Sequence, residues 1–341
     1  MRSGRAYDSF TLLDDAAVHA REVPVARALA AAFGSPWRMF QAPAPRGETL
    51  LRMLEMKSGL NSLAMAFDLP IFERLRETYG ARRTYWSGDG GDKVLPDHRP
   101  RLGRAGQADL ARYLIASRPI WTAAMIARLV GVGEEELQAG VEAGLARYPE
   151  AGADQRFVRF QLVERGPRWI FEGEDCNRHH YWTVAPFYDR AFLRAALACP
   201  DDQKSGHRLF RRFLGRLHPA VNRIPDANLG IAMDSPLYPW SRRLREVGRR
   251  FPGLRRRLRM GQPASVLRPR PALIGTLLAR QIERSEPVRS CFSAAALAEV
   301  AASPDAWSDA ALDGLVTATC ACERIMGRPS TLSELAGKSF G

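Results

Sequence analysis

The sequence contains no apolar run of the roughly 20 residues that a membrane-spanning helix requires. Residues 1–5 are not followed by an apolar segment of the kind that a secretory signal peptide carries. Internal repeats and low-complexity tracts are also missing. These absences argue against a membrane-embedded, exported or solenoid protein, and we expect a cytoplasmic one.

Cysteine is scarce, and no two cysteines have the CxxC spacing of a zinc or redox site. The five cysteines are Cys176, Cys199, Cys291, Cys320 and Cys322. We expect them to be reduced thiols, and Cys320 and Cys322 to be small helical residues. His179 and His180 lie near Cys176, but adjacent histidines point apart on a helix, so we do not expect them to bind a metal.

The 341 residues are 46% hydrophobic and 26% charged, which predicts a buried core in one large or two moderate domains. Fifty Lys and Arg residues against 37 Asp and Glu residues give a net charge of +13. Nine of the arginines gather in one stretch: Arg242, Arg243, Arg245, Arg249, Arg250, Arg255, Arg256, Arg257 and Arg259. This stretch is either a solvated helix face or a surface for an acidic or phosphorylated peptide or RNA. Aromatic residues do not interleave it in the way that single-strand binders use, so we do not expect nucleic acid.

The first part of the chain alternates between strand and helix patterns. Strands are predicted at 7–13, 37–41 and 83–86, and helices at 18–33, 50–67 and 69–79, with Gly80 ending the last helix. Such alternation predicts a parallel sheet with ligands at the carboxyl ends of its strands. Later segments have mainly helical spacing: 108–116, 121–129, 134–148, 154–164, 191–198, 208–217 and 292–326. We therefore divide the chain into an α/β part, residues 1–105, and a helical part, residues 106–341.

The segment Ser87–Asp92, Ser-Gly-Asp-Gly-Gly-Asp, directly follows the third predicted strand. Its three glycines allow a tight turn and close approach to a bulky anion. Its two aspartates would repel that anion unless a divalent cation lay between them. The segment therefore predicts a nucleotide phosphate loop that binds through Mg²⁺.

The sequence Pro186-Phe187-Tyr188-Asp189 occurs further along the chain. Its order and spacing after the glycine loop resemble the synthetase domain of the asparagine synthetase family, which includes β-lactam synthetases and the macrolactam cyclases of lasso peptides. The resemblance extends over most of the chain and implies a parallel-sheet adenine-nucleotide alpha-hydrolase-like (HUP, PP-loop) domain with a mostly helical C-terminal half. It also implies ATP and Mg²⁺: the enzymes adenylate a carboxylate, and an amine then displaces AMP to form an amide.

On this resemblance, Leu12 packs against adenine, Ser87 and Gly88 hold the nucleotide, and Gly90 and Gly91 offer backbone N–H groups to the phosphates.

The resemblance also implies the metal and catalytic residues. Asp92 would bind Mg²⁺, and Asp89 would orient or deprotonate the incoming amine. His207 stands where relatives carry a lysine that stabilises pyrophosphate, and Lys204 or Arg208 could take that place instead.

Two family features are altered. The first pyrophosphate loop, Ser-Gly-Gly-x-Asp-Ser, is only imitated at residues 3–9. The resemblance then implies a missing central strand and Mg²⁺ ligand, through a misplaced start, a gene split or decay, and a partner could supply the missing N-terminal part. Thr183-Val184-Ala185 replaces a Glu-x-Arg pattern, and no glutaminase domain precedes the loop.

We expect an ATP-dependent carbon–nitrogen ligase that makes asparagine or, better matched to these changes, cyclises a peptide. The alternative is an inactive relative that binds a peptide or a partner enzyme as a scaffold.

Other residues near the second motif are expected to be structural. Asp175, Asp189 and Arg190 would fix the helices around the Pro-Phe turn rather than catalyse. Tyr181 and Trp182 would be core residues rather than the lining of a substrate pocket.

Overall fold

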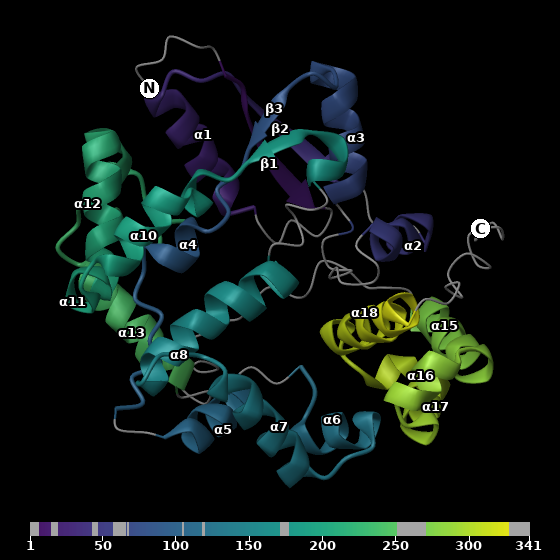
Figure 1. The fold of residues 1–341 in the computed structure, drawn as a ribbon. Helices are drawn as coiled ribbons and strands as arrows, with labels where there is room; N and C mark the ends of the chain where they lie inside the picture. The colour runs from purple at the N-terminus through teal and green to yellow at the C-terminus, as the bar shows by residue number, and fades with distance from the viewer. Residues whose placement is uncertain are drawn as a thin grey trace. The chain divides into compact units, whose positions relative to one another are not determined.

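The computed structural model describes residues 7–14, 20–42, 47–56, 66, 68–103, 106–117, 120–170, 177–250 and 271–326 (Figure 1). The chain is mixed α/β and mostly helical, with a small parallel sheet. Two compact units are present. The first unit comprises Met1–Ala44, Trp86–Asp97 and Ala185–Val266, and the second comprises Pro45–Tyr85, His98–Val184 and Leu267–Gly341.

The first unit contains a β–α–β motif: strand β1 (Ser9–Asp14), helix α1 (Glu22–Ala32) and strand β2 (Trp37–Ala42) (Figure 1). The strands are parallel, with Ser9 opposite Trp37 and Asp14 opposite Ala42. Helix α1 ends because Gly34 adopts a φ of +63°, which lets the N–H of Ser35 reach the carbonyl of Ala30 at 2.9 Å.

The remainder of the first unit is a set of short helices. They are α4 (Gly91–Val94), η3 (Pro186–Tyr188), α10 (Arg190–Ala198), α11 (Asp201–Lys204), η4 (Ser205–His207), α12 (Arg208–Leu217), η5 (Pro219–Arg223) and α13 (Tyr238–Arg250).

The second unit is mainly helical. Its helices are α2 (Gly47–Met56), α3 (Asp68–Tyr79), α5 (Gln107–Ser117), α6 (Ala123–Val130), α7 (Glu134–Ala146), α8 (Ala153–Phe160), η2 (Gln161–Ile170), α15 (Pro271–Arg284), α16 (Glu286–Cys291), α17 (Ala294–Ala302), η6 (Pro304–Ala306) and α18 (Asp309–Ile325). A two-stranded sheet joins β3 (Thr84–Trp86) to β4 (Trp182–Val184).

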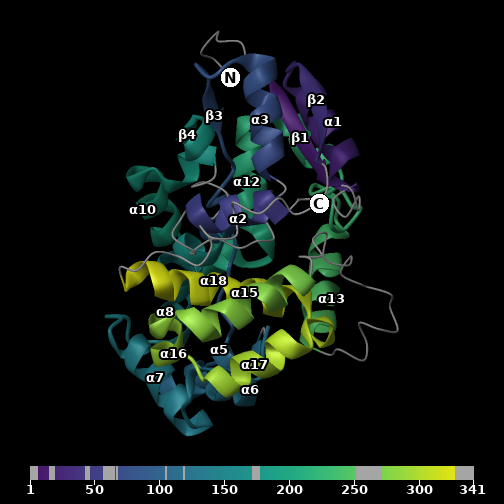
Figure 2. The ribbon, with the colours of Figure 1, turned by 90° about the vertical axis from the view of Figure 1, so that its right-hand side faces the viewer.

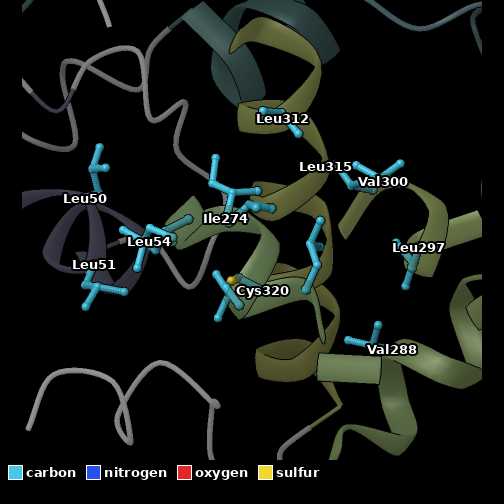
Figure 3. Close-up of a cluster of buried hydrophobic side chains, with 14 of the residues drawn as sticks. Leu50, Leu51, Leu54, Ile274, Val288, Leu297, Val300, Leu312, Leu315 and Cys320 are labelled. Atoms are coloured by element: carbon cyan, nitrogen blue, oxygen red, sulfur yellow. The ribbon is translucent and has the colours of Figure 1, made fainter. Parts of the chain in front are cut away.

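The largest core lies in this second unit. Helices α15 to α18 lie side by side in both views (Figures 1 and 2) and bury a common apolar face. Leu50, Leu51 and Leu54 of α2 belong to the same cluster (Figure 3). Cys320 is fully buried within it, and burial raises the pKa of its thiol to about 12. Cys320 is therefore a small helical residue, as predicted, and it lies in the core.

Sequence periodicity located most of these elements. Strands β1 and β2, helices α1, α3, α5, α7 and α12, and the stop at Gly80 lie where predicted, within a few residues. Strand β4 and helix α15 were not predicted. The boundary proposed at residue 105 stays a prediction, because compact units need not coincide with domains.

Strand β3 differs from expectation. Within the residues that the structure describes, it pairs with β4, whereas β1 and β2 form a separate parallel pair. The coarse prediction of an α/β chain with a parallel sheet is confirmed. In the described part of the chain, no helix combines the length and apolarity needed to cross a bilayer.

Candidate nucleotide site at the glycine loop

The glycine loop, defined as residues 87–92, links β3 to α4 and belongs to the first unit. Ser87 is buried, and its hydroxyl donates to Asp89 Oδ2 at 2.7 Å. The same Ser87 oxygen accepts the backbone N–H of Asp89 at 3.1 Å. Gly90 has a φ of +88° and begins α4. The turn is therefore closed by its own side chains at a backbone angle that suits glycine.

The carboxyl group of Asp89, in the glycine loop, has a shifted pKa. Burial raises its pKa, the hydrogen bond from Ser87 lowers it, and the charge of Asp92 raises it further. The net direction is upward, toward the range in which a carboxylate can take up a proton from an amine.

The glycines face two aromatic rings. A Cβ atom added to Gly90 would overlap the ring of Tyr188, and one added to Gly91 would lie 3.0 Å from the ring of Phe187. Both rings belong to the Pro-Phe-Tyr-Asp motif. The two motifs that were linked only by their order in the sequence thus lie in direct contact.

The Pro-Phe-Tyr-Asp turn is anchored to two helices. The ring of Phe187 lies 5.4 Å from that of Phe192 on α10 and 6.2 Å from that of Phe213 on α12, centroid to centroid. Asp189 caps α10 by accepting the N–H of Phe192 at 2.9 Å. Asp189 is therefore a structural residue, as predicted, and Arg190 is the exposed first residue of α10.

Asp92, the predicted Mg²⁺ ligand, is exposed, and its carboxylate contacts the ammonium of Lys93. The side chain of Lys93 is mostly buried, with 9% exposure. Sequence reasoning missed Lys93. Its position directly after the loop, as a cationic side chain, was the signal that could have identified it as a candidate site residue.

Lys204 and His207 lie in the turn between α10 and α12. Lys204 is buried, and its ammonium donates to the carbonyl of Leu197 at 3.3 Å. The Nδ1 atom of His207 lies 3.3 Å from the hydroxyl of Tyr238 on α13. The six residues of the glycine loop therefore lie together. Lys204 has a hydrogen-bond partner on α10, and His207 has one on α13.

Leu12 lies in the middle of β1, opposite Phe40 of β2, and is partly exposed. Its predicted contact with adenine stays a prediction. Residues 3–6 of the imitated loop, Asp175, and residues 251–259 of the arginine stretch lie outside the described residues.

The aromatic residues before the second motif divide into buried and exposed ones. Tyr181 is buried, with its ring 6.2 Å from that of Phe72, so the prediction of a core residue is confirmed. Trp182 is 78% exposed, and the same prediction is wrong for it. The cause is the alternation along β4, which buries Thr183 and directs Trp182 outward.

His180 is buried and stacks on Phe72 at 5.6 Å, whereas His179 is exposed. Burial, together with the smaller effects of the charges of His179 and Arg52, lowers the pKa of His180 from 6.5 to about 4. Within the described ranges, no three His, Cys, Asp or Glu side chains gather as they would around a metal ion.

We expect His180 to make the second unit sensitive to acid. The unfolded chain takes up a proton on this imidazole near pH 6.5, but the folded chain does so only near pH 4, so stability falls as the pH drops between these values. Replacing His180 by Phe should flatten that part of the stability–pH curve in urea titrations. His179→Phe, at the exposed neighbour, is the control. Parallel curves for wild type and His180→Phe would contradict the expectation.

Comparison of the chain with protein-family models, curated proteins and solved structures finds no match.

Proposed function

We propose that this chain is an ATP-dependent carbon–nitrogen ligase related to the asparagine synthetase family. It would adenylate a carboxylate and form an amide with an amine, either in asparagine synthesis or, better suited to its altered motifs, in closing a peptide macrolactam. The proposal includes an adenine-nucleotide alpha-hydrolase-like arrangement of the sheet.

The contact between the two motifs is the observation that carries this proposal. Gly90 packs on Tyr188 and Gly91 on Phe187, although the motifs are far apart in the sequence. If either motif resembled the family only by chance, there would be no reason for the two motifs to lie in contact. The anchoring of Phe187 on α10 and α12 extends this contact to the turn that holds Lys204 and His207.

The charged residues of the loop suit Mg²⁺ and a polyphosphate. Asp92 presents an exposed carboxylate, the oxygen ligand that Mg²⁺ prefers. Lys93 lies beside it and would contact a phosphate once the cation replaced it at Asp92. When bound, the metal would neutralise phosphate charge. Because rings lie where side chains of Gly90 and Gly91 would point, these residues could meet a phosphate only through their backbone N–H groups. The N–H of Gly91 would have to leave the carbonyl of Gly88, to which it donates at 3.3 Å.

Asp89 would act on the amine. Its carboxylate is held by the Ser87 hydroxyl at 2.7 Å, which fixes its direction. Its raised pKa makes it a better proton acceptor for an ammonium substrate than an exposed aspartate. Asp89 would therefore orient the amine and remove its proton as the amide forms.

Pyrophosphate release from ATP tests the proposal. We expect release that depends on both Mg²⁺ and a substrate, tested with aspartate plus an ammonia donor and with peptides that carry an acidic side chain and a free N-terminus. Asp92→Asn should lower the rate at least ~10-fold, because the metal loses a charged ligand. Asp202→Asn, the same change at an exposed aspartate of α11, is the matched control. Release that is unaffected by Asp92→Asn would contradict the assignment.

The scaffold alternative is favoured by a different observation. The loop glycines are explained by packing against Phe187 and Tyr188 even without a ligand, and Asp92 contacts Lys93. On this alternative the chain would bind a peptide without consuming ATP. Peptide binding measured by calorimetry, with no pyrophosphate released at any Mg²⁺ concentration, would favour the scaffold over the enzyme.

A further inference from the structure

Three polar side chains, those of His207, Tyr238 and Asp226, form a hydrogen-bonded chain. The hydroxyl of Tyr238 is 3.3 Å from His207 Nδ1 and 3.2 Å from Asp226 Oδ2. Tyr238 is fully buried, and the guanidinium of Arg211 lies 5.6 Å from the centre of its ring. His207 itself has a φ of +62°, a left-handed conformation that residues other than glycine rarely adopt. Its surroundings therefore hold this histidine in one place.

The direction of these hydrogen bonds follows from which of the three side chains has a proton to donate. Asp226 Oδ1 accepts the backbone N–H groups of Asn228 at 2.8 Å and Leu229 at 3.0 Å. An ionised carboxylate only accepts, so the single hydroxyl proton of Tyr238 goes to Asp226 Oδ2. The oxygen of Tyr238 can then only accept from His207. The Nδ1 atom of His207 must carry a proton.

We infer that Asp226 and Tyr238 are positioning residues that fix His207 in the Nδ1–H tautomer, so that the imidazole gains and loses its second proton at Nε2. Burial, and secondarily the charge of Asp226, raise the pKa of Tyr238 to about 12, which keeps its hydroxyl a donor.

For catalysis, the inference rests on the proposed function. There His207 occupies the position of a lysine, and a cationic imidazole of fixed orientation would replace the ammonium beside pyrophosphate. The hydrogen bonds from His207 through Tyr238 to Asp226 would compensate for having an imidazole in place of the lysine ammonium. Tyr238→Phe should then lower kcat for pyrophosphate release about 10-fold with little change in KM for ATP. An unchanged kcat would overturn the positioning role.

The tautomer can be measured without ATP or any substrate. We expect the ¹⁵N spectrum of histidine-labelled full-length protein, at a pH where the ring is neutral, to show His207 as the Nδ1–H tautomer. The resonances are assigned by their loss in His207→Gln. Tyr238→Phe removes the acceptor and should shift His207 toward the Nε2–H tautomer, while His218 stays unchanged. A wild-type Nε2–H tautomer, or no shift in Tyr238→Phe, would overturn the inference.

A second variant keeps the test decisive if Tyr238→Phe does not fold. In Asp226→Asn, the amide oxygen would keep the two backbone N–H groups, and the amide nitrogen would face Tyr238 as a donor. The hydroxyl of Tyr238 would then donate to His207 Nδ1, and the tautomer should change to Nε2–H. An unchanged tautomer contradicts the inference. Absence of pyrophosphate release in the wild type, with the expected tautomers, would instead refute the proposed function alone.

Discussion

Replacing Gly90 by alanine is expected to lower the free energy of unfolding by about 2–5 kcal/mol, because two costs combine. A φ of +88° costs a residue with a Cβ atom roughly 1–2 kcal/mol. The new Cβ would also overlap the ring of Tyr188, and overpacking of this kind costs about 1–3 kcal/mol. Urea denaturation followed by circular dichroism measures the loss.

The matched control is Gly34→Ala. Gly34 lies in the same unit and also has a positive φ, +63°, but no atom lies within 4 Å of an added Cβ. Its substitution should therefore cost only the conformational part, roughly 1–2 kcal/mol. The difference between the two variants measures the contact between the two motifs. Equal losses would mean that Tyr188 does not pack on the loop as described.

A double-mutant cycle isolates the ring. Tyr188→Ala opens the space that the methyl group of Gly90→Ala would occupy, so the combined variant should be more stable than the sum of the two losses predicts, by about 1–2 kcal/mol. Strict additivity would assign the loss at Gly90 to backbone conformation alone.

The glycine loop shows what the sequence could and could not predict. Its position after a strand and the turn at Gly90 follow from composition, because three glycines in six residues allow little else. The reason for Gly91 could not be predicted, since it depends on Phe187, whose approach is decided by tertiary packing. The composition of the loop indicated that it binds a ligand. The structure adds a second reason for the glycines, because aromatic rings pack against them.

The fold divides in a similar way. Helix α3 and the parallel pair β1–β2 were predictable because their segments are long enough to show a period. Strands β3 and β4 have three residues each, too few for an alternating pattern to identify their pairing. The partners of His207 were hidden for another reason. Asp226 and Tyr238 follow it at distances along the chain that no local motif defines.

Replacing Leu278 by alanine in α15 should destabilise the second unit by about 2–5 kcal/mol, the range for removing a buried leucine side chain without collapse of the cavity. Leu278 has 0% exposure and lies in the cluster formed by α2, α6 and α15 to α18, so a cavity there would be closed on all sides. Urea denaturation should show a lower midpoint with little change in slope, provided that the second unit unfolds in one step. Ile325→Ala, at a 72% exposed side chain of α18 in the same unit, is the control, and we expect it to change stability by no more than about 0.5 kcal/mol. If both variants lose the same stability, the helices of this unit do not enclose Leu278, and the cluster of Figure 3 is not the core that holds the unit together.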